Sequence, residues 1–418
     1  MLRDPGRALG TGPCLATSNK GDILDVTAPI RRLDHPNGEI WTFDPERIAD
    51  PNRKSAPWVW DLIASVQSIA DAKRIADCWR YASGQPQTGG DDFFPGTAAQ
   101  QLADYLFAAH LGGRSVSDVF RWCSNERDTS PADILSEYPR YAGIASRVSS
   151  VIALTPETRS GVFGSLQTMV AFLADPEIID WIDPHRDTNG NIDERRGLFD
   201  PYEFATSEDT LYLLSAQGRP STALTASLTA VVAFTAFQRA QSEFTGNNRR
   251  LPVPLCCVLD EAANICRWPE LADVYSYFGS AGIPIMTIWQ NPDQGRAAFG
   301  ETNFGSLFNN ANITVYLGGI KDAKFLGEIS QLVGQREIVR GSVNIDGTGR
   351  RSVNNSIQKE NILDVSDLTE WPVGRALLLA SQSRAQIVKT LPWTGNRQWA
   401  DALAQAKAKA QEEQRKAA

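Results

Sequence analysis

Two adjacent carboxylates at the end of an apolar run are the residues of this chain best suited to chemistry. The segment from Val253 to Leu259 is apolar, and Asp260 and Glu261 follow it directly. A short unbroken apolar run is typical of a strand buried on both faces of a parallel sheet. Because open α/β sheets bind ligands at the carboxyl ends of their strands, both acids are expected at a ligand-binding edge.

An acid pair at such an edge suits magnesium-assisted phosphate chemistry. Asp260 is predicted to hold Mg²⁺ through the ion's water shell, and Glu261 to orient or deprotonate the water that attacks a γ-phosphate. This pattern has the form of a Walker B element. The alternative is a strand that runs into a helix whose first turn is acidic, which the helix dipole also favours.

A glutamine ends a second strand-like segment. Gln290 follows the apolar stretch from Ile283 to Trp289, and the chain between Asp260 and Gln290 is long enough for one helix and one return strand. Gln290 is therefore expected beside Asp260 at the same edge of the sheet. There its amide could hydrogen-bond the γ-phosphate or the attacking water, although a polar strand cap would look the same in sequence.

Other polar residues near these motifs have two interpretations each. Asn264 and Arg267 follow the acid pair, where they would support it or lie on the surface of the next helix. Arg296, Arg336 and Arg340 are candidate arginine fingers for a neighbouring subunit and are equally compatible with ordinary surface positions.

The composition indicates a globular chain of two or more domains. It has 418 residues, of which 42% are hydrophobic and 22% charged. The net charge is 41 − 49 = −8. The chain as a whole therefore does not have the charge of a nucleic-acid-binding protein, and any DNA contact needs a local basic surface or a shared channel.

Cysteine, histidine and leader patterns exclude several classes of protein. The six cysteines show no CxxC spacing and are expected to be reduced thiols of a cytosolic protein, while three scattered histidines make a zinc site unlikely. No signal peptide opens the chain. The apolar segment from Ala223 to Phe237 is shorter than the ~20 residues that cross a bilayer, so a buried core helix is predicted.

Strand-like segments alternate with helical patterns, which predicts an α/β fold with a mostly parallel sheet. The strand-like segments are Cys14 to Thr17, Glu39 to Phe43, Thr210 to Ala216, Val253 to Leu259, Ile283 to Trp289 and Ile313 to Leu317. Two more, Arg375 to Ala380 and Gln386 to Thr390, predict a hairpin. Gly341 to Ser356 is rich in Gly, Ser and Asn and predicts a mobile loop, and Trp399 to Ala418 predicts a solvated terminal helix.

The stretch between Asp44 and Thr210 has no strand pattern and predicts an all-α insertion. Its predicted helices are Trp58 to Ala82, Gly96 to Leu111, Val116 to Cys123 and Thr158 to Leu173. The predicted division is residues 1–57 for the first part of an α/β domain, 58–200 for the insertion, 201–395 for the rest of that domain, and 396–418 for a helical tail.

The phosphate-binding loop that should accompany a Walker B strand is missing. That loop, GxxxxGK[ST], needs a Gly-Lys dipeptide, which this chain lacks. Lys20 is predicted to follow a strand rather than to precede a helix. If Cys14 to Thr17 is the strand after the loop's helix, the 13 residues before Cys14 are too few for a strand, loop and helix of about 20 residues. The loop is therefore expected upstream of Met1.

Motif order and spacing resemble the type IV secretion coupling proteins (the VirD4/TraG/TraD group), especially those of actinobacterial conjugative elements. The matching segments are TGPCLATSNKGDILDVTAPIRR, GEIWTFDPE, TLYLLSAQG, LDEAANICRWPELADVYSYFGSAGIPIMTIWQNPDQ, NNANITVYLGGIKDAKFLGEISQLVG and PVGRALLLASQSRAQI. The stretch that joins the acid pair to Gln290 is the most specific of them.

The resemblance implies a RecA-like P-loop NTPase with an inserted all-α domain, acting as a homo-hexameric ATPase at the cytoplasmic face of the inner membrane. Such proteins recruit a relaxase bound to single-stranded DNA and deliver it to the type IV secretion channel. It implies ATP and Mg²⁺ as cofactors, with Asp260 as the magnesium-side acid, Glu261 as catalytic base and Gln290 as γ-phosphate sensor. The transmembrane helices and the loop lysine of the family are missing, so this chain alone is expected in the cytoplasm.

Three functions remain open from the sequence. The first is an amino-terminally truncated coupling-protein motor that cannot hydrolyse ATP alone. The second is a non-catalytic binding module of the same fold. The third is a related hexameric DNA translocase of the chromosome-partitioning type, against which the large helical insertion argues.

Overall fold

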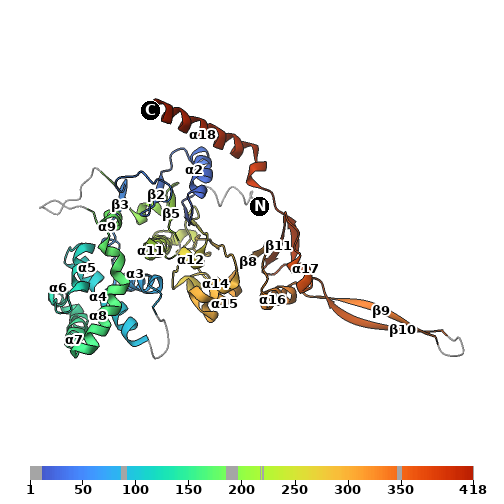
Figure 1. Cartoon of the computed structure of the whole chain (residues 1–418), viewed down its shortest axis with the longest axis horizontal. Coiled ribbons are helices and arrows are strands. Elements are labelled where there is room, and N and C mark those ends of the chain that lie inside the picture. The colour runs from blue at the N-terminus through green and yellow to red at the C-terminus, as the bar shows by residue number, and fades with distance from the viewer. Residues whose placement is uncertain are drawn as a thin grey trace.

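The computed structural model describes residues 12–85, 92–184, 196–216, 218, 221–345 and 351–417. Its centre is a five-stranded sheet in the order β2–β5–β1–β6–β7 (Figure 1). The strands are β1 (Cys14–Ser18), β2 (Ile40–Phe43), β5 (Thr210–Leu214), β6 (Cys256–Leu259) and β7 (Ile285–Thr287). Each overlaps a segment that the sequence predicts as a strand. All the pairings are parallel, which confirms the predicted α/β class.

Different helices cover the two faces of this sheet, because successive side chains of a strand point to opposite sides. On one face Ala16 and Tyr212 pack with helix α2 (Asp22–Asp34). On the other face Leu15 joins the main core of the protein, to which helix α11 (Ser221–Ser242) contributes. Burial on both faces explains why the strands read as unbroken apolar runs.

Helix α11 is the buried helix that the sequence predicts, although it is longer than the apolar segment from Ala223 to Phe237. It has 22 residues and is the one described helix long and apolar enough to cross a membrane. However, 78% of its most apolar window is buried inside the protein, against the sheet and the neighbouring helices.

A layer of helices lies beside the sheet (Figure 1). These helices are α3 (Ile69–Ala82), α4 (Phe93–Leu111), α5 (Val116–Ser124), α6 (Ser130–Ser136), α7 (Ala142–Ile152), α8 (Pro156–Val170) and α9 (Pro176–Ile182). Two short strands, β3 (Trp58–Trp60) and β4 (Gly197–Phe199), pair in parallel where this helical region begins and ends. The domain boundaries at residues 57/58 and 200/201 stay predictions.

The predicted helix from Trp58 to Ala82 is wrong in its first part. Residues 58–60 are a strand, and all three side chains are buried, as suits aromatic and β-branched residues in a sheet. The helix begins only at Ile69, where the Ser68 side chain accepts a hydrogen bond from the backbone N–H of Asp71. This cap supplies the start signal that the apolar pattern alone did not reveal.

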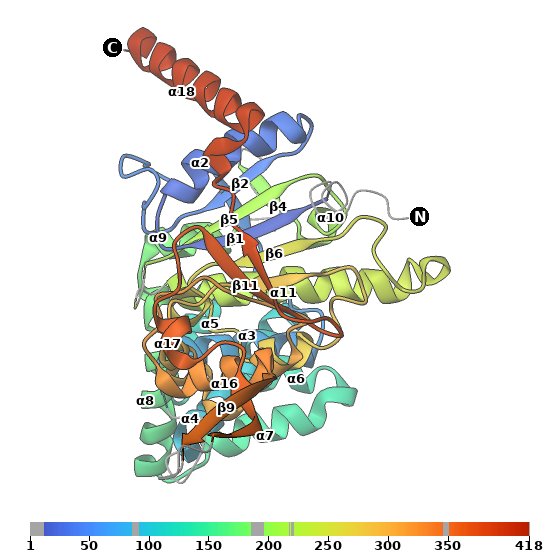
Figure 2. The same ribbon diagram turned by 90° about the vertical axis from the view of Figure 1, so that its right-hand side faces the viewer.

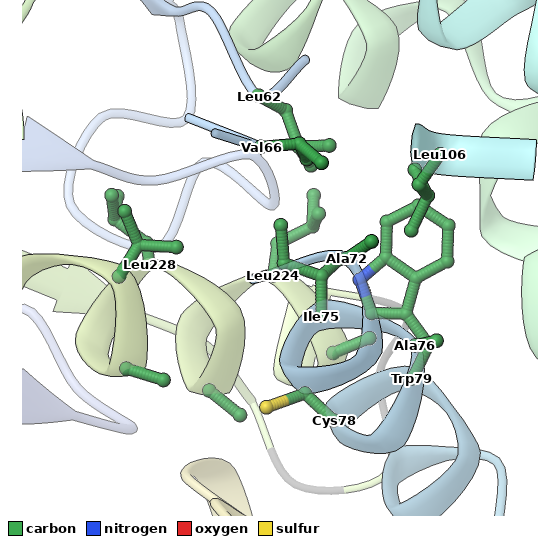
Figure 3. Close-up of a cluster of buried hydrophobic side chains, with 14 of the residues drawn as sticks. Leu62, Val66, Ala72, Ile75, Ala76, Cys78, Trp79, Leu106, Leu224 and Leu228 are labelled. Atoms are coloured by element: carbon green, nitrogen blue, oxygen red, sulfur yellow. The ribbon is translucent and has the colours of Figure 1, made fainter. Parts of the chain in front are cut away.

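The helical region and the sheet share one hydrophobic core (Figure 3). Ile75 and Trp79 of α3 lie in the same buried cluster as Leu224 and Leu228 of α11. The indole Nε1 of Trp79 donates a hydrogen bond to Ser227 Oγ at 3.1 Å, so the buried ring also has its polar atom satisfied. The insertion is therefore packed directly onto the sheet's covering helix.

A smaller antiparallel sheet follows, in the order β12–β11–β8. Its strands are β8 (Ile313–Tyr316), β11 (Arg375–Ala380) and β12 (Gln386–Lys389), covered by α16 (Ala323–Val333) and α17 (Val365–Thr369). The predicted hairpin of β11 and β12 is confirmed. Strand β8, expected among the alternating strands of a mostly parallel sheet, instead pairs antiparallel with β11.

The predicted mobile loop from Gly341 to Ser356 is wrong for the described residues. Strands β9 (Gln335–Ile345) and β10 (Arg351–Asn361) form a long antiparallel ribbon that projects from the protein (Figure 1). Cross-strand pairing organises this polar, glycine-containing stretch, so its composition did not reveal it.

The remaining helices are short connectors and one terminal helix. They are α10 (Pro201–Phe204), α12 (Ala262–Ile265), α13 (Leu271–Val274), α14 (Pro292–Phe299), α15 (Glu301–Asn310) and α18 (Arg397–Ala417). Helix α18 matches the predicted terminal helix. It meets α2, buries Leu403, and extends outward beyond it (Figure 2).

Replacing Trp79 by alanine should lower the free energy of unfolding by about 3–5 kcal/mol, because it removes a fully buried ring and leaves Ser227 without its donor. Urea unfolding followed by circular dichroism measures the change. Trp399→Ala, at a position of α18 that is 37% exposed, is the matched control and should lower stability clearly less than Trp79→Ala does. Equal effects of the two substitutions would contradict the shared core.

Candidate functional site

The acid pair lies at the carboxyl end of β6, as the sequence predicts. Thr17, at the end of neighbouring β1, donates a hydrogen bond through Oγ1 to the carbonyl oxygen of Asp260 at 2.8 Å. Glu261 has left-handed backbone angles, with φ 54° and ψ 37°. Because this region is unfavourable for a residue with a side chain, the surrounding contacts must hold Glu261 in place.

The surroundings of Asp260 disfavour its charged form. Burial raises the pKa of Asp260 above its ordinary value, and the negative charge of Glu261 raises it further. The positive charge of Lys20 acts in the opposite direction. A divalent cation at this position would therefore be stabilised by both acids, and oxygen ligands are those that Mg²⁺ prefers.

Glu261 and Gln290 are in contact. The side-chain amide of Gln290, just beyond β7, donates to Oε1 of Glu261, and Asn264 Nδ2 donates to Oε2 at 2.5 Å. Both carboxylate oxygens therefore accept from an amide, which fixes the orientation of the group. The contact brings Gln290 to the acid pair at the edge of the sheet where the sequence predicts it, with Glu261 rather than Asp260 as its partner. The catalytic roles of Asp260, Glu261 and Gln290 stay predictions.

Of the two candidate supporting residues, only Asn264 contacts the acid pair. Asn264 is buried and holds Glu261, so its place in the first turn after the strand is structural support for the site. Arg267 instead donates through Nε to the carbonyl oxygen of Ala263 at 3.1 Å, and burial lowers its pKa.

Among the described residues, none of the candidate arginine fingers forms an ion pair with Asp260 or Glu261. Arg296 forms ion pairs with Asp293, Glu301 and Asp322, which commits its charge within the chain. Arg336 and Arg340 lie on the projecting ribbon, where Arg340 pairs with Glu360.

Lys20 lies near the acid pair, a position that the sequence analysis did not predict. It was expected to follow a strand and not to precede a helix, but it stands in the short turn between β1 and α2. Strand, turn and helix place it near Asp260, whose pKa it lowers. The start of α2, with acidic residues in its first turn, was the available sign.

Two other acids at this end of the sheet form hydrogen bonds or ion pairs within the protein and so stabilise the fold. Asp44, after β2, is buried, accepts from two backbone amides and pairs with Arg53 at 3.2 Å. Glu46 accepts from the backbone N–H of Ala216 at 3.0 Å and from Ser221 Oγ at 2.6 Å, at the start of α11. Both are fully engaged by the protein, unlike the carboxylate of Asp260.

The sheet has an unpaired edge next to the site. In the part of the chain that the structure describes, β7 pairs only with β6. Met286, in the middle of β7, and Ile288, just after the strand, are 57% and 42% exposed. Strand β8 is likewise an edge strand, of the smaller antiparallel sheet, and its residues Ile313 and Val315 are exposed. Large apolar side chains beside an open strand edge favour the addition of further polypeptide there.

Comparisons with known proteins find a family match in the second half of the chain. Residues 254–373 match the family model described as the TraM recognition site of TraD and TraG. Over residues 254–373 the chain is therefore similar to the TraG/TraD group of type IV coupling proteins. The matched region contains the acid pair, Gln290 and the projecting ribbon.

Solved structures of the conjugative coupling protein TrwB share its fold. The unbound monoclinic form matches with a TM-score of 0.56 and 15% identity, and the complex with ADP and Mg²⁺ with a TM-score of 0.56 and 14% identity. Each match covers 92% of this chain and 86% of the TrwB chain. The RecA-like fold expected from the sequence is thereby confirmed. Among curated protein sequences, no significant match was found.

A pair of thiols lies at the opposite, amino end of the same strands. Cys14 of β1 stands directly beside Cys256 of β6 in the ladder. The hydrogen bond with Cys14 lowers the pKa of Cys256 to about 7, and the charge of Arg31 adds to this effect. That hydrogen bond and burial raise the pKa of Cys14.

Replacing Asp260 by asparagine should raise the thermal unfolding midpoint of the ligand-free protein at pH 7. A raised pKa in the folded state means that ionisation of Asp260 costs stability as the pH rises above the ordinary aspartate value of about 4. The increase in the unfolding midpoint of Asp260→Asn over the parent protein should therefore shrink towards zero as the pH falls to that value. Calorimetry over this pH range tests it, with exposed Asp273→Asn as control. A gain that is the same at every pH would contradict the assigned cause.

Cys256 should react with iodoacetamide at neutral pH, with a half-maximal rate near its pKa of about 7. Cys257, the next residue, is buried with a raised pKa and should stay unmodified in the folded protein. Peptide mass spectrometry after timed labelling measures both sites. In Cys14→Ala, the half-maximal pH at Cys256 should rise, and an unchanged value would contradict the thiol pairing.

Proposed function

We propose that this chain is a type IV coupling protein and that it carries the magnesium and water side of an ATP site. In this proposal Asp260 binds Mg²⁺ through water, Glu261 acts as the catalytic base, and Gln290 senses the γ-phosphate. The observation that carries it is the contact of Gln290 with Glu261 at one edge of the sheet. The solved complexes of TrwB with ADP and Mg²⁺ and with a non-hydrolysable ATP analogue support it by analogy.

The residues present fit one half of such a site. Asp260 and Glu261 offer carboxylate oxygens, and the raised pKa of Asp260 favours a cation beside it. The two amides on Glu261 keep its carboxylate in one orientation, which a base needs when it takes a proton from water. When bound, Mg²⁺ would neutralise charge that develops on the phosphate oxygens.

The other half must come from a phosphate-binding loop, which the described residues do not supply. We infer that a strand, a glycine-rich loop and a helix add to the sheet beside β7. The unpaired edge of β7 and the exposed Met286 and Ile288 support this placement. Without that loop the described residues lack the backbone amides and the lysine that bind the β- and γ-phosphates, so they would not hydrolyse ATP alone.

The proposed role is transfer of conjugative DNA. In this role the protein would recruit a relaxase joined to single-stranded DNA, assemble as a homo-hexamer at the cytoplasmic face of the inner membrane, and drive the cargo into a type IV secretion channel. The family match and the TrwB fold support a place in conjugation. With a net charge of −8, DNA binding would depend on the assembled ring and weaken steeply with salt.

A non-catalytic binding module is the second candidate, because the described residues lack a phosphate-binding loop. The two functions differ in what a supplied loop would do. A motor would gain Mg²⁺-dependent ATP binding and turnover, whereas a binding module would gain neither.

Glu261→Gln should leave nucleotide binding intact and lower ATP turnover by about 100-fold or more, in a chain extended by a strand–GxxxxGKS–helix segment. The amide keeps the shape of the side chain but cannot accept a proton. Calorimetric titration with Mg·ATP and phosphate release measure binding and turnover. Asp273→Asn, an exposed acid outside the site, is the matched control.

Two outcomes would contradict the proposal. Retained turnover in Glu261→Gln would remove Glu261 from the mechanism. Micromolar binding of Mg·ATP by the chain without the added segment would show that another part of these residues holds the phosphates.

A further inference from the structure

The β9–β10 ribbon has an apolar pair exposed on one side. Val339 and Ile357 face each other across the ladder and are 67% and 69% exposed. Because an isolated two-stranded ribbon is only marginally stable in water, an exposed apolar pair on it favours a covering partner.

The ribbon also differs in charge from the rest of the chain. Its residues 335–361 contain five basic residues (Arg336, Arg340, Arg350, Arg351 and Lys359) and three acidic ones (Glu337, Asp346 and Glu360), a net charge of +2. Because the whole chain has a net charge of −8, the residues outside the ribbon have a net charge of −10. This difference favours contact between the ribbon of one copy and the body of another.

A groove between α15 and α16 has complementary properties. Its volume is about 400 Å³, and its apolar lining comes from Phe304, Phe308 and Phe325. Leu332, at the rim, is 60% exposed. Glu328 lies beside it and has no ion-pair partner among the residues that the structure describes. The groove therefore offers an apolar floor with a free carboxylate at its edge.

We propose that the ribbon of one copy docks into the α15–α16 groove of the next copy. Val339 and Ile357 would cover the phenylalanines, and a basic residue of the ribbon would meet Glu328. The ribbon leaves α16 at Gly334 and runs away from α15 (Figure 1), so it does not reach the groove of its own chain. Such head-to-tail contacts close into a ring or extend into a filament.

Protein fits this surface better than nucleic acid. Contacts to phosphates need basic and hydrogen-bonding groups, and they leave aliphatic side chains such as Val339 and Ile357 uncovered. The aromatic groove supplies the apolar surface that those side chains lack. The interface does not depend on nucleotide binding, so its test and that of the ATP site are separate.

Photo-crosslinking tests the docking directly. The full chain is made with p-benzoylphenylalanine at position 357, and, as a matched control, at position 356 on the opposite face of the ribbon. Mixed ¹⁵N-labelled and unlabelled chains are irradiated, and mass spectrometry identifies links between copies. The proposal predicts links from position 357 to residues 301–332 of another copy, and few from 356; the probe at position 339 repeats the test if the first variant misfolds.

Three results would overturn the proposal: links to another region, equal yields from 356 and 357, or links to added duplex DNA in place of protein. Sedimentation velocity supplies the second measurement. Leu332→Glu should weaken self-association roughly ten-fold or more, whereas Leu391→Glu, an exposed leucine outside the groove, should not. A chain that stays monomeric up to its highest soluble concentration would also reject it.

Discussion

The parallel pairing of β6 with β7 is the constraint on which the candidate site depends. Leu259 pairs with Thr287, so both strands end at the same edge of the sheet. The residues that follow each strand are therefore delivered to the same place, and Glu261 meets Gln290. Strand β1 adds a second restraint on the other side of β6, because Thr17 bonds the backbone of Asp260.

The acid pair is unfavourable for the fold in two ways. Glu261 adopts a left-handed backbone conformation, and the pKa of Asp260 is raised by burial and by its acidic neighbour. Strain and like charge at one position are typical of functional sites, where a ligand relieves part of the cost. Asp44 and Glu46, at the same end of the sheet, show the contrast, since the protein itself satisfies both carboxylates.

Most of the central sheet could be predicted from the sequence because its strands are buried on both faces and read as apolar runs. The approach of Gln290 to the acid pair could also be predicted, because the two parallel strands that precede these residues end at the same edge of the sheet. The approach of Lys20 to Asp260 could not, because it depends on how tightly the chain turns into α2.

Two elements that depend on pairing between strands were not predicted from the sequence. Strand β3 exists through its pairing with β4, which lies far along the chain at the other end of the helical region. The β9–β10 ribbon is stabilised by a cross-strand ladder and not by burial, so its Gly, Ser and Asn residues look like a loop. The composition around β3 does not reveal its distant partner, and the composition of the ribbon is typical of a loop although its two strands are neighbours in sequence.

A double-mutant cycle on Glu261 and Gln290 tests the central claim most directly. The free energy of unfolding is measured for the parent chain, Glu261→Ala, Gln290→Ala and the double variant. If the two side chains meet at the sheet edge, their coupling energy should be about 0.5–1.5 kcal/mol. Effects that add to within about 0.3 kcal/mol would contradict the contact, and with it the shared edge on which the proposed site is built.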